Sequence, residues 1–155
     1  MIRLATKEDI ERINELRKQV NDVHVNGRPD MFQDGFGQEI QNLAYDMIEG
    51  ENTDILVAVR DDVICGFACV GYMERPDSPY MRGRKFYHVD EFGVDKAFRR
   101  QGVATELFAC IKEQAKEKGF ERIELDVWGF NEGAIKFYES VGFLTMRKYL
   151  EFAEL

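Results

Sequence analysis

The sequence predicts a mixed α/β domain in which helices cover both faces of one twisted sheet. Two β-rich runs, 54–60 and 63–73, are separated only by Asp61-Asp62, which is the pattern of an antiparallel hairpin. A strand, a helix and another strand then follow one another across 86–128, and this order requires parallel pairing. A chain of 155 residues with both patterns is expected to form a single domain, residues 1–155, with roughly six or seven strands and about four helices.

Hydrophobic periodicity and turn residues place the individual elements. In the first part of the chain we expect a strand at 2–5, a helix from about 10 to 20, a loop at 21–37 and a helix at 40–48 that ends at Gly50. After the hairpin we expect a strand at 86–94, a helix at 102–119, a strand at 122–128, a helix at 133–141 and a last strand at 143–152. The order predicts an antiparallel first half and a parallel second half of one sheet.

Composition excludes several classes of protein. The chain has 29 acidic and 21 basic residues, a formal charge of −8, which argues against a nucleic-acid partner. It lacks both the run of about 20 apolar residues that a membrane span needs and a secretory signal, so we expect a cytoplasmic protein. Its three cysteines, Cys65, Cys69 and Cys110, have no companions that would complete a zinc site, so we expect buried thiols and no metal.

The segment from Val94 to Thr105 carries the strongest chemical signal. It joins a strand to a helix, and Gly102 and Ala104 leave backbone N–H groups uncovered at the helix N-terminus, where an anion is favoured. Lys96 and the two arginines that precede Gln101 add positive charge. The segment therefore predicts a pyrophosphate site. It does not match the nucleotide-binding motifs, because no Lys-Ser/Thr follows Gly102 and no G-x-G-x-x-G is present.

Two motifs in this order give the chain a resemblance to the GNAT superfamily of N-acetyltransferases. The first is the phosphate-cradling motif, Arg99-Arg100-Gln101-Gly102-Val103-Ala104. The second, downstream motif consists of Asn131, Ala134, Phe137, Tyr138, Gly142 and Phe143. The resemblance covers residues 86–143 and implies a GNAT-like fold that uses acetyl-CoA as cosubstrate.

The resemblance also implies where acetyl-CoA binds. The strands at 86–94 and 122–128 would splay apart, with the pantetheine arm between them on the backbone of Phe92 and Val94. The pyrophosphate would lie on Arg99, Arg100, Gln101, Gly102, Val103, Ala104 and Thr105. The far wall of the groove would comprise Asn131, Ala134 and Phe137, although core packing explains the last two equally well.

Acyl transfer to an amine needs an acid for the departing thiolate and a base for the amine. By resemblance Tyr138 is the acid, and the alternative is a tyrosine that only packs. The base is open: His88 and Asp90 share one strand face, a bulge would re-aim Glu91, and water could also remove the proton. Histidine accepts protons most readily near neutral pH, which favours His88.

The sequence says least about the acceptor, the amine that would receive the acetyl group. By resemblance, residues 21–54 would wall the acceptor site, and they hold eight acidic residues against Arg28 alone. Such a wall would attract a cationic amine, such as a polyamine, an aminoglycoside or a lysine side chain, unless it is merely a solvated face. Aromatic contacts could come from His24, Phe32, Phe36 and Tyr45, or these residues could be core.

Two hypotheses follow. The first is an acetyl-CoA-dependent N-acetyltransferase acting on a cationic small molecule or a basic peptide. The second is a non-catalytic acyl-CoA-binding sensor or interaction module that uses the same groove. The resemblance also allows a homodimer, which nothing in residues 143–155 decides.

Overall fold

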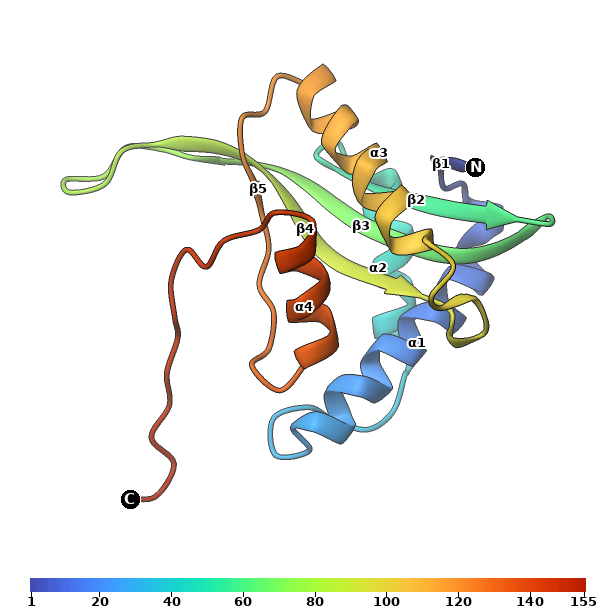
Figure 1. The fold of residues 1–155 in the computed structure, drawn as a ribbon, viewed down its shortest axis with the longest axis horizontal. Coiled ribbons are helices and arrows are strands. Elements are labelled where there is room, and N and C mark those ends of the chain that lie inside the picture. The colour runs from blue at the N-terminus through green and yellow to red at the C-terminus, as the bar shows by residue number, and fades with distance from the viewer.

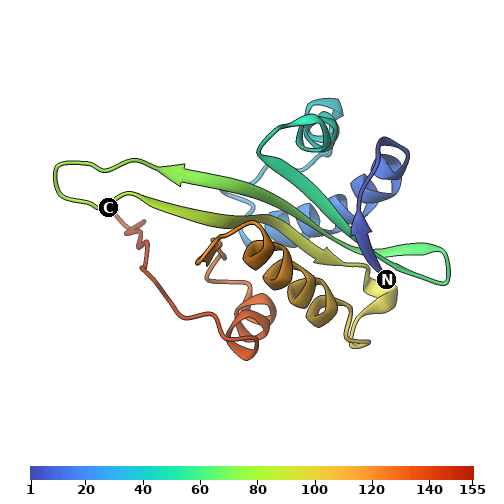
Figure 2. The ribbon, with the colours of Figure 1, turned by 90° about the horizontal axis from the view of Figure 1, so that it is seen from above.

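The computed structural model describes residues 1–155 and contains one five-stranded sheet in the order β1-β2-β3-β4-β5. The strands are β1 (Ile2–Leu4), β2 (Thr53–Arg60), β3 (Val63–Arg75), β4 (Arg84–Val94) and β5 (Ile123–Glu124). The α-helices are α1 (Ile10–Gly27), α2 (Gln38–Glu49), α3 (Val103–Glu117) and α4 (Glu132–Ser140). Helices α1 and α2 cover one face of the sheet, and α3 and α4 lie on the other (Figures 1 and 2).

The sheet has the mixed topology that the sequence predicts. Strands β1 to β4 pair in antiparallel fashion, and β5 pairs in parallel with β4. The β2–β3 hairpin turns at Asp61 and Asp62, whose φ angles of 50° and 61° are the left-handed values that a two-residue turn of this hand requires. The predicted hairpin and the predicted parallel crossover are both confirmed.

Two hydrophobic clusters lie on opposite faces of this sheet. On the α3 face, Tyr87 and Val89 of β4 pack against Leu107 and Ile111. On the α1 face, the fully buried Phe67 of β3 packs in a cluster with residues of α1 and β2. Cys65 and Cys69 are buried, one on each face, and Cys110 is half-buried, so the cysteines are free thiols. None of the helices combines the length and apolar character that crossing a membrane requires.

The first helix is longer than predicted. It continues past Val20 to Gly27, so the predicted loop at 21–37 begins too early. Residues 21–26 contain no glycine or proline to end a helix. Gly27 is required for a tertiary reason, because a Cβ there would lie 2.2 Å from the ring of Phe130. This contact between distant segments has no local sequence signal.

The prediction of six or seven strands is wrong, because the sheet has five. Only Ile123 and Glu124 of the predicted strand 122–128 pair with β4. The predicted strand 143–152 forms no ladder at all, and this segment runs away from the sheet after α4 (Figure 1). Alternating apolar residues indicate that a segment can form a strand, but they do not supply the neighbour that a strand must pair with.

Candidate active site

Strand β4 contains a β-bulge at Asp90. Val89 lies opposite Val70 of β3 and Glu91 lies opposite Cys69, so Asp90 has no partner residue. Side chains and backbone N–H and C=O groups alternate along a strand, so one extra residue turns all those that follow it to the opposite side. The bulge that the resemblance implied is therefore present, and it turns Glu91 toward α1, away from the face that carries Val89.

The bulge leaves one edge of β4 open. The only β4–β5 partners are Tyr87 with Ile123 and His88 with Glu124. Further along, the N–H of Asp95 donates to the carbonyl of Cys65 on β3, at 2.8 Å. Hydrogen bonding alternates along an antiparallel ladder, so the intervening Phe92 and Val94 direct their N–H and C=O groups to the opposite side, where no strand follows. This edge can accept an extended, amide-containing ligand.

The open edge leads into the loop that the first motif predicted. Arg100 and Gly102 have positive φ angles, 62° and 79°, and α3 begins at the next residue, Val103. Closely spaced residues in such conformations turn their N–H groups toward one concave point, which suits an anion. Arg99 and Arg100 are exposed and make no ion pair, so their charge remains available. Gln101 is held through its carbonyl, which accepts from Arg60 at 2.9 Å.

Sequence reasoning missed the residue that anchors this loop. Asp95 is 9% exposed and accepts hydrogen bonds from the N–H of Ala97 (3.1 Å), from Gln19 (3.3 Å) and from Arg12. Burial alone would raise the pKa of Asp95, but these bonds hold it below its ordinary value. Its position before a short 3-10 turn, 96–98, is the local signal that could have identified it.

Tyr138 lies within a cluster of aromatic rings on α4. Its ring centroid is 5.6 Å from that of Phe137, 5.5 Å from Phe143 and 6.2 Å from Phe92. Burial raises the pKa of Tyr138 to about 12, so its phenol remains protonated at neutral pH. The hydroxyl has no hydrogen-bond partner in the protein and is not fully enclosed. It is available to a ligand.

The structure brings two of the four predicted catalytic residues to one groove. His88 and Tyr138 both line an open groove of about 1410 Å³ beside β5, whereas Asp90 and Glu91 do not. Asp90 is exposed at the bulge. Glu91 accepts two hydrogen bonds from Arg17, at 2.8 and 2.9 Å, and Arg17 is 4% exposed. Both carboxylate oxygens of Glu91 are thus occupied by Arg17, so neither is free to contact a substrate amine.

The residues of the second motif also have structural roles. Asn131 caps α4, because its side chain accepts from the N–H of Ala134 at 3.3 Å. Phe137 stacks on Phe92 of β4, with ring centroids 5.7 Å apart, and packs against the α3-face cluster. These contacts fix α4, and with it Tyr138, beside the open edge of β4.

The acidic residues of 21–54 do not form a continuous wall. Four of the eight have partners: Asp22 with Lys18, Asp30 with Arg28, Glu49 with Lys7, and Asp54 with the hydroxyl of Tyr72. The unpaired ones near the connection between α1 and α2 are Asp34 and Glu39. Three of the eight negative charges that the sequence assigned to this wall are thus offset by a neighbouring cation, whereas Asp54 keeps its charge beside a neutral hydroxyl.

The predicted aromatic residues separate into two groups. His24 stacks on Phe32, and Phe32 contacts Trp128, with ring centroids 5.0 Å apart in both pairs. This cluster joins the end of α1 to the segment that follows β5, and burial lowers the pKa of His24. Phe36 instead lies 5.5 Å from the guanidinium carbon of Arg17, and Tyr45 is exposed.

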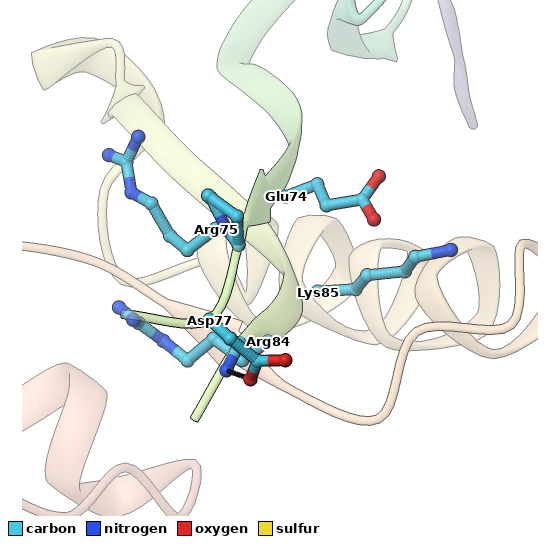
Figure 3. A pocket seen from close by; sticks show the side chains of 7 residues that line it. Glu74, Arg75, Asp77, Arg84 and Lys85 are labelled. Carbon is cyan, nitrogen blue, oxygen red and sulfur yellow. Dashed lines mark hydrogen bonds between the residues drawn. The ribbon is translucent and has the colours of Figure 1, made fainter. Parts of the chain in front are cut away.

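A second, smaller pocket lies on the long β3–β4 hairpin (Figure 3). It has a volume of about 350 Å³ and no hydrophobic lining. Arg75 and Arg84 point to one side of the hairpin, and Glu74 and Lys85 point to the other (Figure 3). The pocket contains none of the predicted site residues, but it shares both arginines with the groove beside β5.

Comparison with known proteins agrees with the geometry. A model of the acetyltransferase (GNAT) family matches residues 10–143. The thialysine N-epsilon-acetyltransferase of Caenorhabditis elegans is 31% identical over 64 residues, which cover 41% of this chain and 40% of that protein. The L-ornithine N5-acetyltransferase NATA1 of Arabidopsis thaliana is 25% identical over 91 residues, 59% of this chain and 38% of that protein. The chain thus matches only about two fifths of the length of these relatives.

Solved structures extend the likeness to the whole chain. A single-site mutant of the BH1408 protein from Bacillus halodurans is 29% identical and has a TM-score of 0.95, covering 100% of this chain and 99% of that one. Its name states no activity, so it supports the fold. The family model spans residues 10–143, which is most of the chain and includes both motifs and the open edge of β4. The chain therefore belongs to the acetyltransferase (GNAT) family.

Proposed function

We propose that this protein transfers the acetyl group of acetyl-CoA to a primary amine. The observation that carries the proposal is one continuous path in the structure. The unpaired edge of β4 at Phe92 and Val94 leads at one end to the exposed amides of the Arg99–Gly102 loop. Tyr138, with its free hydroxyl, is held against Phe92 on the same side of the sheet.

The residues along this path fit acetyl-CoA. Amides of the pantetheine arm would pair with the backbone of Phe92 and Val94, as an added strand does. The pyrophosphate would be held by the amides from Gln101 to Thr105 and by the charges of Arg99 and Arg100. Asn131, Ala134 and Phe137 would line the α4 side. Acetyl-CoA supplies an activated acetyl group with a thiolate leaving group.

Tyr138 is proposed as the general acid. Its hydroxyl would donate a proton to the sulfur as the carbon–sulfur bond breaks. The same apolar surroundings that raise the pKa of Tyr138 disfavour a thiolate, so the basicity of the leaving sulfur rises together with that of the phenol. His88 is proposed as the base, directly or through water, because it shares the groove with Tyr138.

The proposed acceptor is a primary amine on a small molecule, with a preference for cations. The two named relatives support it, since their names give thialysine and L-ornithine as substrates. Within this chain, the unpaired Asp34 and Glu39 would raise the local concentration of a cationic amine. Asp30 is less effective because Arg28 offsets its charge.

The proposal predicts amine-dependent release of CoA. The purified protein is incubated with acetyl-CoA and a panel of amines that includes lysine analogues, ornithine, polyamines, aminoglycosides and neutral amines, and free thiol is measured. We expect release with at least one amine and an N-acetylated product by mass spectrometry. Acetyl-CoA binding without release for every amine would contradict the proposal and support a binding module instead.

The same panel tests the preference for cations. Asp34→Lys and Glu39→Lys should raise KM for cationic amines by roughly 3- to 10-fold, as expected for the loss of local attraction, and leave KM for neutral amines unchanged. Asp22→Lys, at an acid already paired with Lys18, is the matched control. Equal effects on cationic and neutral amines would remove the electrostatic explanation.

A further inference from the structure

Helix α1 holds the end of β4 from the face of the sheet opposite α3 (Figures 1 and 2). Every second residue from 91 to 95 meets a side chain of α1, and the contacts are Arg17 with Glu91, Val20 with Gly93, and Arg12 and Gln19 with Asp95. The fit is close, because a Cβ on Gly93 would lie 2.7 Å from a methyl carbon of Val20. Between these residues lie Phe92 and Val94, whose backbone forms the open edge. The α1 contacts therefore fix the strand that carries the proposed cofactor site.

Gln19 makes two hydrogen bonds to the start of the pyrophosphate loop, residues 95–102. Its Nε2 donates to Oδ1 of Asp95 at 3.3 Å, and its Oε1 accepts from the backbone N–H of Lys96 at 3.1 Å. An ionised carboxylate only accepts and an N–H only donates, so a side-chain amide satisfies both partners in one orientation. Asp95 in turn accepts from the N–H of Ala97 at 3.1 Å. Gln19 thus helps to set the course of the backbone at residues 95–97.

The far end of the loop is held by a different strand. Arg60 of β2 donates to the carbonyl of Gln101 at 2.9 Å and to the carboxylate of Glu106 on α3 at 2.8 Å. Between the two attachments, Arg99 and Arg100 make no hydrogen bond or ion pair to another part of the chain. The conformation of this exposed stretch therefore depends on how its two ends are fixed.

We propose that Gln19 is a positioning residue for the pyrophosphate of acetyl-CoA. The role rests on the proposed function, since the pyrophosphate belongs to the cosubstrate proposed there. Gln19 acts through Asp95 and Lys96, by holding the loop in the conformation that presents its amides to the anion. A loop that is ordered before binding loses less conformational entropy when the ligand binds. Loss of the Gln19 amide should therefore weaken the binding of donors that carry a pyrophosphate and spare a donor that lacks it.

The first test is the affinity for CoA, measured by isothermal titration calorimetry. Gln19→Leu keeps a side chain of similar size and loses both hydrogen bonds, so it should bind CoA about 10-fold more weakly than the wild type. Lys18→Met, at the adjacent exposed position that pairs with Asp22, is the matched control and should bind CoA as the wild type does. Equal affinity of Gln19→Leu and the wild type would overturn the proposal.

The second test uses a truncated donor. S-acetylpantetheine has the thioester and the amides of acetyl-CoA but lacks the pyrophosphate and the nucleotide. With the acceptor found in the amine panel, Gln19→Leu should raise KM for acetyl-CoA about 10-fold and change kcat by less than about two-fold. Its kcat/KM for S-acetylpantetheine should equal that of the wild type. Equal losses with both donors would mean that Gln19 only supports the fold, and would overturn the proposal.

Two further measurements separate the possible failures. Urea unfolding should give Gln19→Leu nearly the stability of the wild type, so that weaker binding is not a sign of unfolding. Amide hydrogen exchange without ligand should be faster at Lys96 in Gln19→Leu, because its N–H loses its acceptor; unchanged exchange there would contradict the assigned contact. Since calorimetry needs no acetyl transfer, a protein that binds CoA in a Gln19-dependent way but acetylates no amine would contradict the proposed reaction and support the role of Gln19.

Discussion

Tyr138→Phe should lower kcat about 100-fold, the usual scale for the loss of a positioned general acid. The phenylalanine ring preserves the packing against Phe137, Phe143 and Phe92, and only the hydroxyl is lost. KM for acetyl-CoA should therefore change by less than about two-fold, because the ring still fills its site. Steady-state rates of CoA release, with the acceptor found in the amine panel, measure both constants.

The pH profile separates the acid from the base. If Tyr138 acts only as the acid, Tyr138→Phe should leave the acid limb of the kcat/KM profile unchanged. His88→Gln should remove that limb while retaining the alkaline behaviour of the wild type. Phe143→Leu, which removes a ring that packs against Tyr138 but keeps the Tyr138 hydroxyl, is the control for packing. Unchanged turnover of Tyr138→Phe at every pH would contradict the assigned role.

Arg17→Met should be the most destabilising of the single substitutions considered. It would leave Glu91 with no partner for its charge beneath α1 and remove the bonds from Arg17 to Asn14 (2.9 Å) and to the carbonyl of Ile40 (2.8 Å). Breaking a buried ion pair by removing one partner costs about 3 kcal/mol or more. For a domain of this size, that corresponds to a fall in Tm of roughly 10 °C. Urea unfolding followed by circular dichroism measures the change.

A double variant tests whether the unpaired charge of Glu91 causes the loss of stability. Arg17→Met with Glu91→Leu replaces both charges by apolar groups and should recover most of the lost stability. Lys18→Met, at the neighbouring exposed position that pairs only with Asp22, should change stability by less than about 0.5 kcal/mol. If Arg17→Met were as mild as Lys18→Met, the ion pair would not be what holds Glu91 and the bulged strand in place.

Local features of the site could be predicted from the sequence, because short-range stereochemistry determines them. The Arg99–Ala104 motif predicted an anion loop, and the positive φ of Gly102 immediately before α3 is the geometry that such a loop needs. The Asp61-Asp62 turn was likewise predictable, since aspartate tolerates positive φ better than most residues.

Features that depend on distant contacts could not be predicted in the same way. The ion pair of Arg17 with Glu91 joins residues 74 positions apart, and nothing near either residue indicates it. The position of the bulge at Asp90 depends on the register between β4 and β3. The close approach of the Phe130 ring to the backbone of Gly27 joins residues that are far apart in the sequence. The segment 143–152 has the pattern of a strand, but whether a strand forms depends on which edge it can reach.

The most direct test of the proposed acetyl-CoA site is amide hydrogen exchange along β4 with and without acetyl-CoA. We expect acetyl-CoA to slow exchange at the amides of Phe92 and Val94, which face the open edge, and to leave Gly93 unchanged, because its amide already faces β3. Binding of acetyl-CoA with no added protection at Phe92 and Val94 would contradict the proposed site.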